Sequence, residues 1–169
     1  MGEDRIFVGR VSTPDGGFSI LGDDVAVLGS GWTTPDVLLA MIGASGAVMS
    51  GEPGSLVARA VSAVEGYYAG EPDLIRGIPV RQVAGEFHTR ARAVLRETGC
   101  GERLTYTQLA ARTGNPRAAR AAASACARNA TALFVPCHRV VRTDGGLGGF
   151  LYGLKVKESL LEYEHGFVL

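Results

Sequence analysis

The chain of 169 residues carries 17 basic and 17 acidic side chains, so its formal net charge is zero. With 46% hydrophobic residues it is long enough for one or two small domains with buried cores. No apolar run approaches the length of a membrane span, and the N-terminus lacks the basic start and apolar core of a secretory signal. We therefore expect a soluble, cytoplasmic protein with no membrane partner.

Cysteine usage argues against a disulfide framework. The three cysteines, Cys100, Cys126 and Cys137, are odd in number and unevenly spaced, which indicates a reducing compartment. The histidines are scattered, and no Cys/His cluster has the spacing of a zinc site. We expect neither a metal site nor a cofactor.

The zero net charge hides a difference between the two halves of the chain. Residues 1–83 hold five basic and ten acidic side chains, whereas residues 84–169 hold twelve basic and seven acidic ones. Between Arg103 and Arg142 there are seven arginines and no acid. Such asymmetry suits a polyanionic partner, although a solvated arginine-rich face would give the same composition.

The first part of the chain is expected to form a small sheet. Three apolar runs separated by turn signals predict strands at Ile6–Val11, Phe18–Leu21 and Val25–Leu28. A glycine- and proline-rich stretch follows, and apolar residues then recur at helical spacing from Leu56 until Gly70. Residues 70–85 resemble a connector to a second domain.

The second part predicts two helices joined by a tight turn. Thr105 or Thr107 can cap the first helix, and Gly114 ends it. Asn115 can cap the second helix, with Pro116 at its first position. This second helix is mostly alanine, and its projecting arginines are Arg117, Arg120 and Arg128. Small residues allow close approach to another surface and the arginines suit phosphates, but many helical hairpins share the pattern.

Two further helices flank this pair. One begins at Glu86 and places its apolar residues on one face, at Phe87, Ala91, Val94 and Leu95. The other closes the chain over residues 152–166 and carries Glu164. Because acidic side chains are seldom buried, the residues alone favour a surface position for Glu164.

The segment FVPCHRVV, residues 134–141, places Cys137 and His138 inside an apolar, β-branched run. Cys137 is either a small buried hydrophobe or a reactive thiol held by the run. A thiol reacts as the thiolate, and its ordinary pKa is about 8.5, so a reactive Cys137 needs a base. Neighbouring side chains of an extended segment point to opposite faces, which makes a direct Cys137–His138 hydrogen bond doubtful.

Several segments together resemble the O6-alkylguanine-DNA alkyltransferase family, also called methylated-DNA–protein-cysteine methyltransferases. They are PCHRVV at 136–141, TYTQLA at 105–110, NPRAARAAASACARN at 115–129, the Lys157/Glu158…Glu164 spacing, TPDGGFSI at 13–20 and YYAGE at 67–71. The resemblance implies an α/β (α+β) fold. Residues 1–83 would form a structural domain of a small antiparallel sheet plus helix, and residues 84–169 a helix-turn-helix, winged-helix-like domain that binds DNA and transfers the alkyl group.

The resemblance also implies the chemistry. Cys137 would accept the alkyl group from O6-alkylguanine in double-stranded DNA, irreversibly and in a single turnover. A water would connect Cys137 to His138, which Glu164 orients in the logic of a catalytic triad. Asn129 would join the second helix to the active-site segment. Tyr106 would assist base rotation and donate a hydrogen bond to the flipped base, at N3 of guanine.

Further residues receive roles from the same resemblance. Arg120 would fill the place of the flipped nucleotide, Arg117 and Arg128 would contact phosphates, and Ala121 and Ala127 would allow close approach to the minor groove. The Val140 carbonyl would accept from the exocyclic amine of the base. The substrate pocket would be completed by Phe150, Leu151, Cys126 and Arg139. We expect a monomer in solution, and cooperative binding on DNA stays open.

The sequence departs from the family pattern at two places, and two alternative functions stay open. Ala91-Arg92 stands where the family commonly has a tryptophan, and Leu151 in the Phe150–Gly153 loop would narrow the pocket. One alternative is a cysteine hydrolase, in which the arginine-rich helix has no role. The other is a non-catalytic lesion-binding or regulatory DNA protein of the same fold, against which the presence of Cys137 argues.

Overall fold

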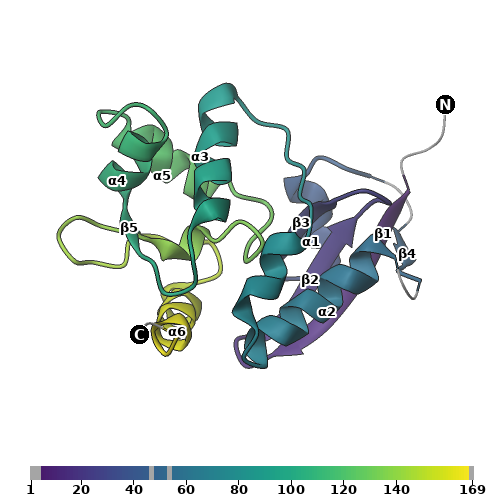
Figure 1. Ribbon diagram of the computed structural model, residues 1–169. Coiled ribbons are helices and arrows are strands. Elements are labelled where there is room, and N and C mark those ends of the chain that lie inside the picture. The colour runs from purple at the N-terminus through teal and green to yellow at the C-terminus, as the bar shows by residue number, and fades with distance from the viewer. Residues whose placement is uncertain (1–4, 46–47, 53–54, 168–169) are drawn as a thin grey trace. The chain divides into compact units, whose positions relative to one another are not determined.

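The computed structural model describes residues 5–45, 48–52 and 55–167 (Figure 1). The chain divides into two compact units, residues 1–82 with 130–134 and residues 83–129 with 135–169. The expected boundary after residue 83 lies one residue away. The segment 130–134 departs from the expectation, because it belongs to the first unit. None of the described helices is long and apolar enough to cross a membrane.

The first unit is built on a four-stranded sheet with the order β3-β2-β1-β4. Its strands are β1 (Ile6–Thr13), β2 (Gly16–Gly22), β3 (Val27–Gly31) and β4 (Val48–Ser50). β1–β2 and β2–β3 pair antiparallel as predicted. The unpredicted β4 pairs parallel to β1, so the sheet is mixed rather than purely antiparallel.

Two helices cover opposite faces of this sheet. α2 (Leu56–Tyr68) was predicted, and the Ser55 hydroxyl caps it by accepting from the Ala58 N–H at 3.2 Å. α1 (Pro35–Met41) was not predicted, because seven residues are too few to show apolar side chains recurring at helical spacing. Val8 packs against the cluster of Ile6, Leu21 and Leu38 that includes α1, whereas a side chain on the next residue, Gly9, would meet α2. This alternation is the period of a strand.

The outer edge of β3 is covered by two segments from elsewhere in the chain. After the 3-10 helix η1 (Pro72–Gly77), the Arg81 N–H donates to Val27 O at 2.9 Å. Further along, Ser30 N–H donates to Ala130 O at 2.8 Å, and the buried Ser30 hydroxyl donates to Ala132 O at 2.9 Å. Because β3 is otherwise an edge strand, these bonds satisfy its free backbone groups and explain why 130–134 joins the first unit.

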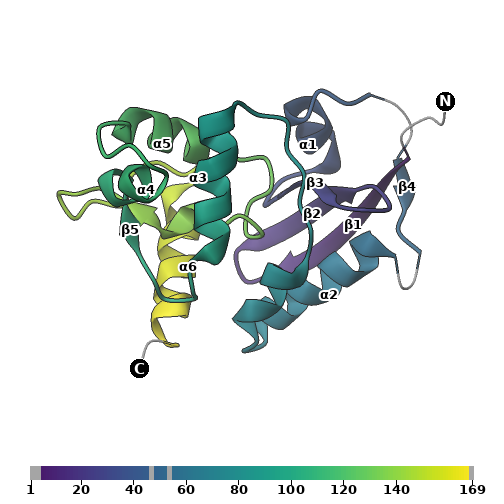
Figure 2. The ribbon, with the colours of Figure 1, turned by 45° about the horizontal axis from the view of Figure 1, so that its top comes forward.

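The second unit packs helices around a two-stranded parallel ribbon (Figure 2). Its elements are α3 (Glu86–Glu97), β5 (Leu104–Thr105), α4 (Tyr106–Arg112), α5 (Ala119–Ala127), the 3-10 turn η2 (Cys137–Arg139), β6 (Val140–Val141) and α6 (Leu154–His165). α3, α4 and α5 pack against one another, and α6 packs against η2. Small residues such as Ala110, Ala122 and Ala125 are buried, so these helices approach closely.

The helix-turn-helix forms at the predicted place with one correction. Thr105 and Gln108 form a reciprocal capping box, with bonds of 3.1 and 2.9 Å, and Gly114 adopts a φ of 110° just after α4. Pro116 is not the first residue of α5. The Asn115 side chain instead accepts from the Arg117 N–H at 3.0 Å and holds a turn, so the helix begins only at Ala119.

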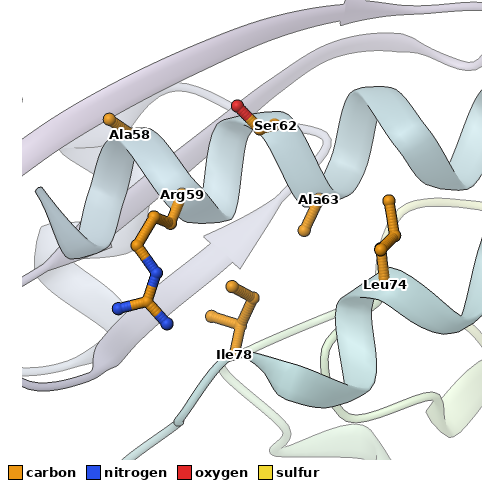
Figure 3. A pocket seen from close by; sticks show the side chains of 6 residues that line it. All are labelled: Ala58, Arg59, Ser62, Ala63, Leu74 and Ile78. Carbon is orange, nitrogen blue, oxygen red and sulfur yellow. The ribbon is translucent and has the colours of Figure 1, made fainter. Parts of the chain in front are cut away.

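A surface pocket of about 380 Å³ lies between α2 and η1 in the first unit (Figure 3). It is lined by Ala58, Arg59, Ser62, Ala63, Leu74 and Ile78. None of the side chains expected to take part in alkyl transfer lines it. The pocket therefore gives no reason to place the expected alkyl-transfer site in the first unit.

We expect Gly9→Ala to destabilise the protein, because a Cβ on Gly9 would lie 2.6 Å from Val61 Cγ2 and 2.8 Å from Val57 Cγ1. Overpacking of this kind typically lowers the free energy of unfolding by about 1–3 kcal/mol. Urea unfolding measures the change. Gly17→Ala is the matched control, since nothing lies within 4 Å of its Cβ, and equal losses in both variants would contradict the packing described.

Candidate active site

The Cys137 thiol lies at the start of the short turn η2 and not in an extended strand. The thiol is buried, with 7% of the residue exposed. The Asn129 side chain donates to Cys137 Sγ at 3.3 Å and to Val135 O at 2.9 Å. Asn129 therefore ties the end of α5 to the segment that presents the thiol, which is the place expected for it.

Charged and polar groups from several elements surround this thiol. Burial raises the pKa of Cys137 above its ordinary value, while the Asn129 hydrogen bond and the positive charges of Lys157 and Arg92 act in the opposite direction. Burial likewise raises the pKa of Cys126, with a further increase from the neighbouring Cys137. The net effect favours a protonated thiol at rest, so reaction requires a base.

Glu164 joins two buried side chains of η2. Its Oε2 lies 2.6 Å from His138 Nε2, and its Oε1 accepts from Arg139 Nε at 2.7 Å. Burial alone would raise the pKa of Glu164, but His138 and Arg139 hold that pKa well below the ordinary range. An ionised carboxylate only accepts, so Nε2 of His138 carries the hydrogen. The residue-based expectation of a surface carboxylate at Glu164 is wrong, since only 1% of it is exposed.

Arg139 is anchored on the same carboxylate. Besides Glu164, its guanidinium donates to Thr98 O at 2.8 Å and to Thr98 Oγ1 at 3.1 Å. Only 2% of Arg139 is exposed. These bonds fix η2 from the side of α3, and they direct the guanidinium of this expected pocket residue toward Glu164 and Thr98.

One face of α6 carries the buried groups, at Lys157, Leu160, Leu161 and Glu164. The Lys157 ammonium donates to Val140 O at 2.6 Å and to Gly149 O at 3.3 Å. Lys157 was not assigned a role from the sequence. The sequence does contain a signal for the burial of Lys157, because the four residues follow the i, i+3, i+4, i+7 spacing of a helix face that packs against a core. Their spacing, and not their polarity, indicates that they are buried.

Tyr106 starts α4 and is half-buried. A Cβ on Gly148 would lie 2.6 Å from the Tyr106 hydroxyl, so the glycine loop passes directly over the phenol. Gly148 also has a φ of 76°, which favours glycine there. Burial and the nearby Cys126 and Cys137 raise the pKa of Tyr106, so the hydroxyl stays protonated and can donate.

The exposed face of α5 and the following loop hold the other expected residues. Arg117, Arg120, Ala127 and Arg128 are exposed, and Ala121 and Cys126 are half-buried. The Phe150 and Tyr152 rings meet edge to face at 5.8 Å, while Leu151 is 58% exposed. Among the described residues, no group of three or more His, Cys, Asp or Glu side chains is placed to hold a metal ion.

We expect Glu164→Gln to cost about 3–5 kcal/mol at neutral pH, as breaking one side of a buried ion pair typically does. The folded state holds the pKa of Glu164 below its ordinary 4.5, so this stabilisation is complete above that pH and is lost as the pH falls toward the folded pKa. Urea unfolding should therefore show a difference from wild type that narrows in acid. The exposed Glu162→Gln is the control, and a pH-independent difference would contradict the ion-pair account.

Comparisons with known proteins show which proteins this chain is similar to. A family model described as "6-O-methylguanine DNA methyltransferase, DNA binding domain" matches residues 86–166. The Salmonella typhimurium regulatory protein Ada is 42% identical over 92 residues, which are 54% of this chain and 26% of that protein. The chain thus spans about a quarter of that relative's length.

Two further proteins match more of their own length. A probable methylated-DNA–protein-cysteine methyltransferase of Acanthamoeba polyphaga mimivirus is 36% identical over 108 residues, 64% of this chain and 72% of the relative. The structure of Mycobacterium tuberculosis OGT in complex with DNA superposes with a TM-score of 0.77 at 25% identity, covering 95% of this chain and 93% of that one. This chain therefore belongs to the methylated-DNA–protein-cysteine methyltransferase, or O6-alkylguanine-DNA alkyltransferase, family.

Proposed function

We propose that this protein repairs DNA by moving the alkyl group of O6-alkylguanine onto Cys137, once per molecule. The observation that carries the proposal is the buried Cys137 thiol on a turn whose next residue, His138, is held by Glu164 at 2.6 Å. Membership of the family, together with the DNA complex of the M. tuberculosis relative, supports DNA as the partner. The protein would act as a monomer.

The thiol proton would pass to His138. The Glu164 carboxylate accepts the hydrogen bond from Nε2 of His138. Nδ1 is therefore the ring nitrogen that would take the Cys137 proton, through a water. The thiolate then attacks the alkyl carbon, forming a C–S bond as the C–O6 bond breaks and its electron pair stays on guanine. The Tyr106 hydroxyl donates a hydrogen bond to guanine N3, which stabilises the negative charge that develops on the base and makes it a better leaving group. No side chain described at the site is expected to remove the alkyl group from the thioether product, so Cys137 would stay alkylated.

DNA would dock on α5. Arg117, Arg120 and Arg128 are exposed on or beside this helix, and the small Ala121 and Ala127 let the backbone approach the minor groove. A thiolate cannot reach O6 in a stacked duplex, so the nucleotide must be flipped out, and Arg120 would take its place. The flipped base would then lie near Cys137, the Val140 carbonyl and the loop that contains Phe150.

The direct test is the intact mass of the protein after incubation with a duplex containing O6-methylguanine. We expect one added methyl group per molecule, mapped to Cys137 and absent from Cys137→Ser. Retained lesion binding without any gain in mass would overturn the proposal and favour a non-catalytic lesion-binding protein.

Arg120→Ala should slow transfer from duplex DNA by on the order of tenfold or more, because the cost of flipping is a few kcal/mol. Transfer from free O6-benzylguanine should stay close to wild type, since no flipping is needed. Single-turnover kinetics on both substrates measures the split. Arg10→Ala, an exposed arginine of β1, serves as the control, and equal losses on both substrates would contradict the role of Arg120.

A further inference from the structure

Arg92 is a buried cation that takes no part in the steps of alkyl transfer proposed above. It lies on α3 with 7% of its surface exposed, and its Nε donates to the Ala125 carbonyl of α5 at 3.2 Å. Within residues 5–45, 48–52 and 55–167, Arg92 forms no ion pair with a carboxylate. A buried charge without a counter-charge is costly, so an anion close to Arg92 would stabilise it.

The candidates for that anion in the described part of the second unit include Glu164 and the thiols of Cys126 and Cys137. Glu164 is already bound by His138 and Arg139. The buried Lys157 adds a further positive charge and bonds only neutral carbonyls in the structure as described. The Cys137 thiol is the buried group that becomes an anion when the protein reacts.

Hydrogen bonds attach Arg92 and the thiol to the same end of α5. Ala125 accepts from Arg92, and the Asn129 N–H donates to the carbonyl of the next residue, Cys126, at 3.2 Å. The Asn129 side chain then reaches Cys137 Sγ at 3.3 Å. Consistent with this short path, burial lowers the pKa of Arg92, and the Cys126 and Cys137 thiols in their ionised form counteract that effect.

We propose that Arg92 is a positioning residue for alkyl transfer, whose guanidinium secures the end of α5 and stabilises the Cys137 thiolate as it forms. This role rests on the proposed alkyl transfer, but the effect of the Arg92 charge on the pKa of Cys137 does not depend on an alkylguanine substrate. Among the other titratable groups around the thiol, Lys157 of α6 lowers the pKa of Cys137, whereas Cys137 itself raises the pKa of Cys126 of α5, Tyr106 of α4 and Tyr152 of the loop before α6. His138 is adjacent to the thiol in the chain. Of these, Lys157 is the other fixed positive charge.

Three variants separate the charge of Arg92 from its hydrogen bond. Arg92→Gln keeps an N–H donor for Ala125 but removes the charge, whereas Arg92→Lys keeps the charge. Arg90→Gln makes the same change on the same helix at an exposed residue that pairs with Glu86. A thermal melt confirms folding, and Arg92→Trp, which fills the space without charge, replaces Arg92→Gln if that variant does not fold.

The measurement is the rate at which iodoacetamide alkylates Cys137 as a function of pH, with peptide masses separating Cys137 from Cys100 and Cys126. In Arg92→Gln the apparent pKa of Cys137 should rise by about one unit, which means about tenfold slower reaction at neutral pH. Arg92→Lys should stay near wild type, and Arg90→Gln should be unchanged.

The proposal is overturned if folded Arg92→Gln has the wild-type pH profile, whatever its melting temperature, because Arg92 would then only hold the helix end. It is also overturned if Arg92→Lys and Arg92→Gln shift equally. Iodoacetamide needs no alkylguanine, so failure of the proposed repair reaction would appear separately, as a wild-type protein that gains no methyl group from the duplex.

Discussion

The arrangement of the second unit depends on one buried carboxylate. Glu164 binds His138 through one oxygen and Arg139 through the other, so two consecutive side chains of η2 are oriented by a single group on α6. The desolvation of an ionised carboxylate is unfavourable, and it is offset only while both partners stay in place. The turn that presents Cys137 is therefore coupled to the helix that closes the chain, and neither can shift without exposing a charge to an apolar interior.

The two faces of α5 have different surroundings. Ala122 and Ala125 are buried against neighbouring helices, while Arg117, Arg120 and Arg128 remain in solvent on or beside it. Its last turn and the residues after it hold Arg92 through Ala125 and the Cys137 thiol through Asn129. Contact of DNA with the exposed face would thus act on an element that also holds the Cys137 thiol, which suits the proposed function of recognising a lesion and reacting with it once.

Local signals in the sequence predicted the elements whose ends are set by nearby residues. The Thr105–Gln108 capping box and Gly114 are short-range features, and α4 lies where they indicate. The start of α5 was wrong because the Asn115 side chain stabilises a turn that competes with the helix. The joining of residues 130–134 to the edge of β3 depends on pairing between segments far apart in the chain. The surface position predicted for Glu164 was wrong because it rested on polarity alone, although Glu164 and Lys157 share the spacing of the core face of α6. The burial of Arg92 and Lys157 was not predicted.

The central claim is that Glu164 holds His138 in the tautomer that can accept the Cys137 proton. Long-range ¹H–¹⁵N NMR of the histidine-labelled protein at neutral pH tests it directly, with His138→Gln to assign the signal among the three histidines. The account predicts a hydrogen on Nε2 and an unprotonated Nδ1 in the resting protein. A hydrogen on Nδ1, whether in the other neutral tautomer or in an imidazolium, would contradict it, because His138 would then have no site for the thiol proton.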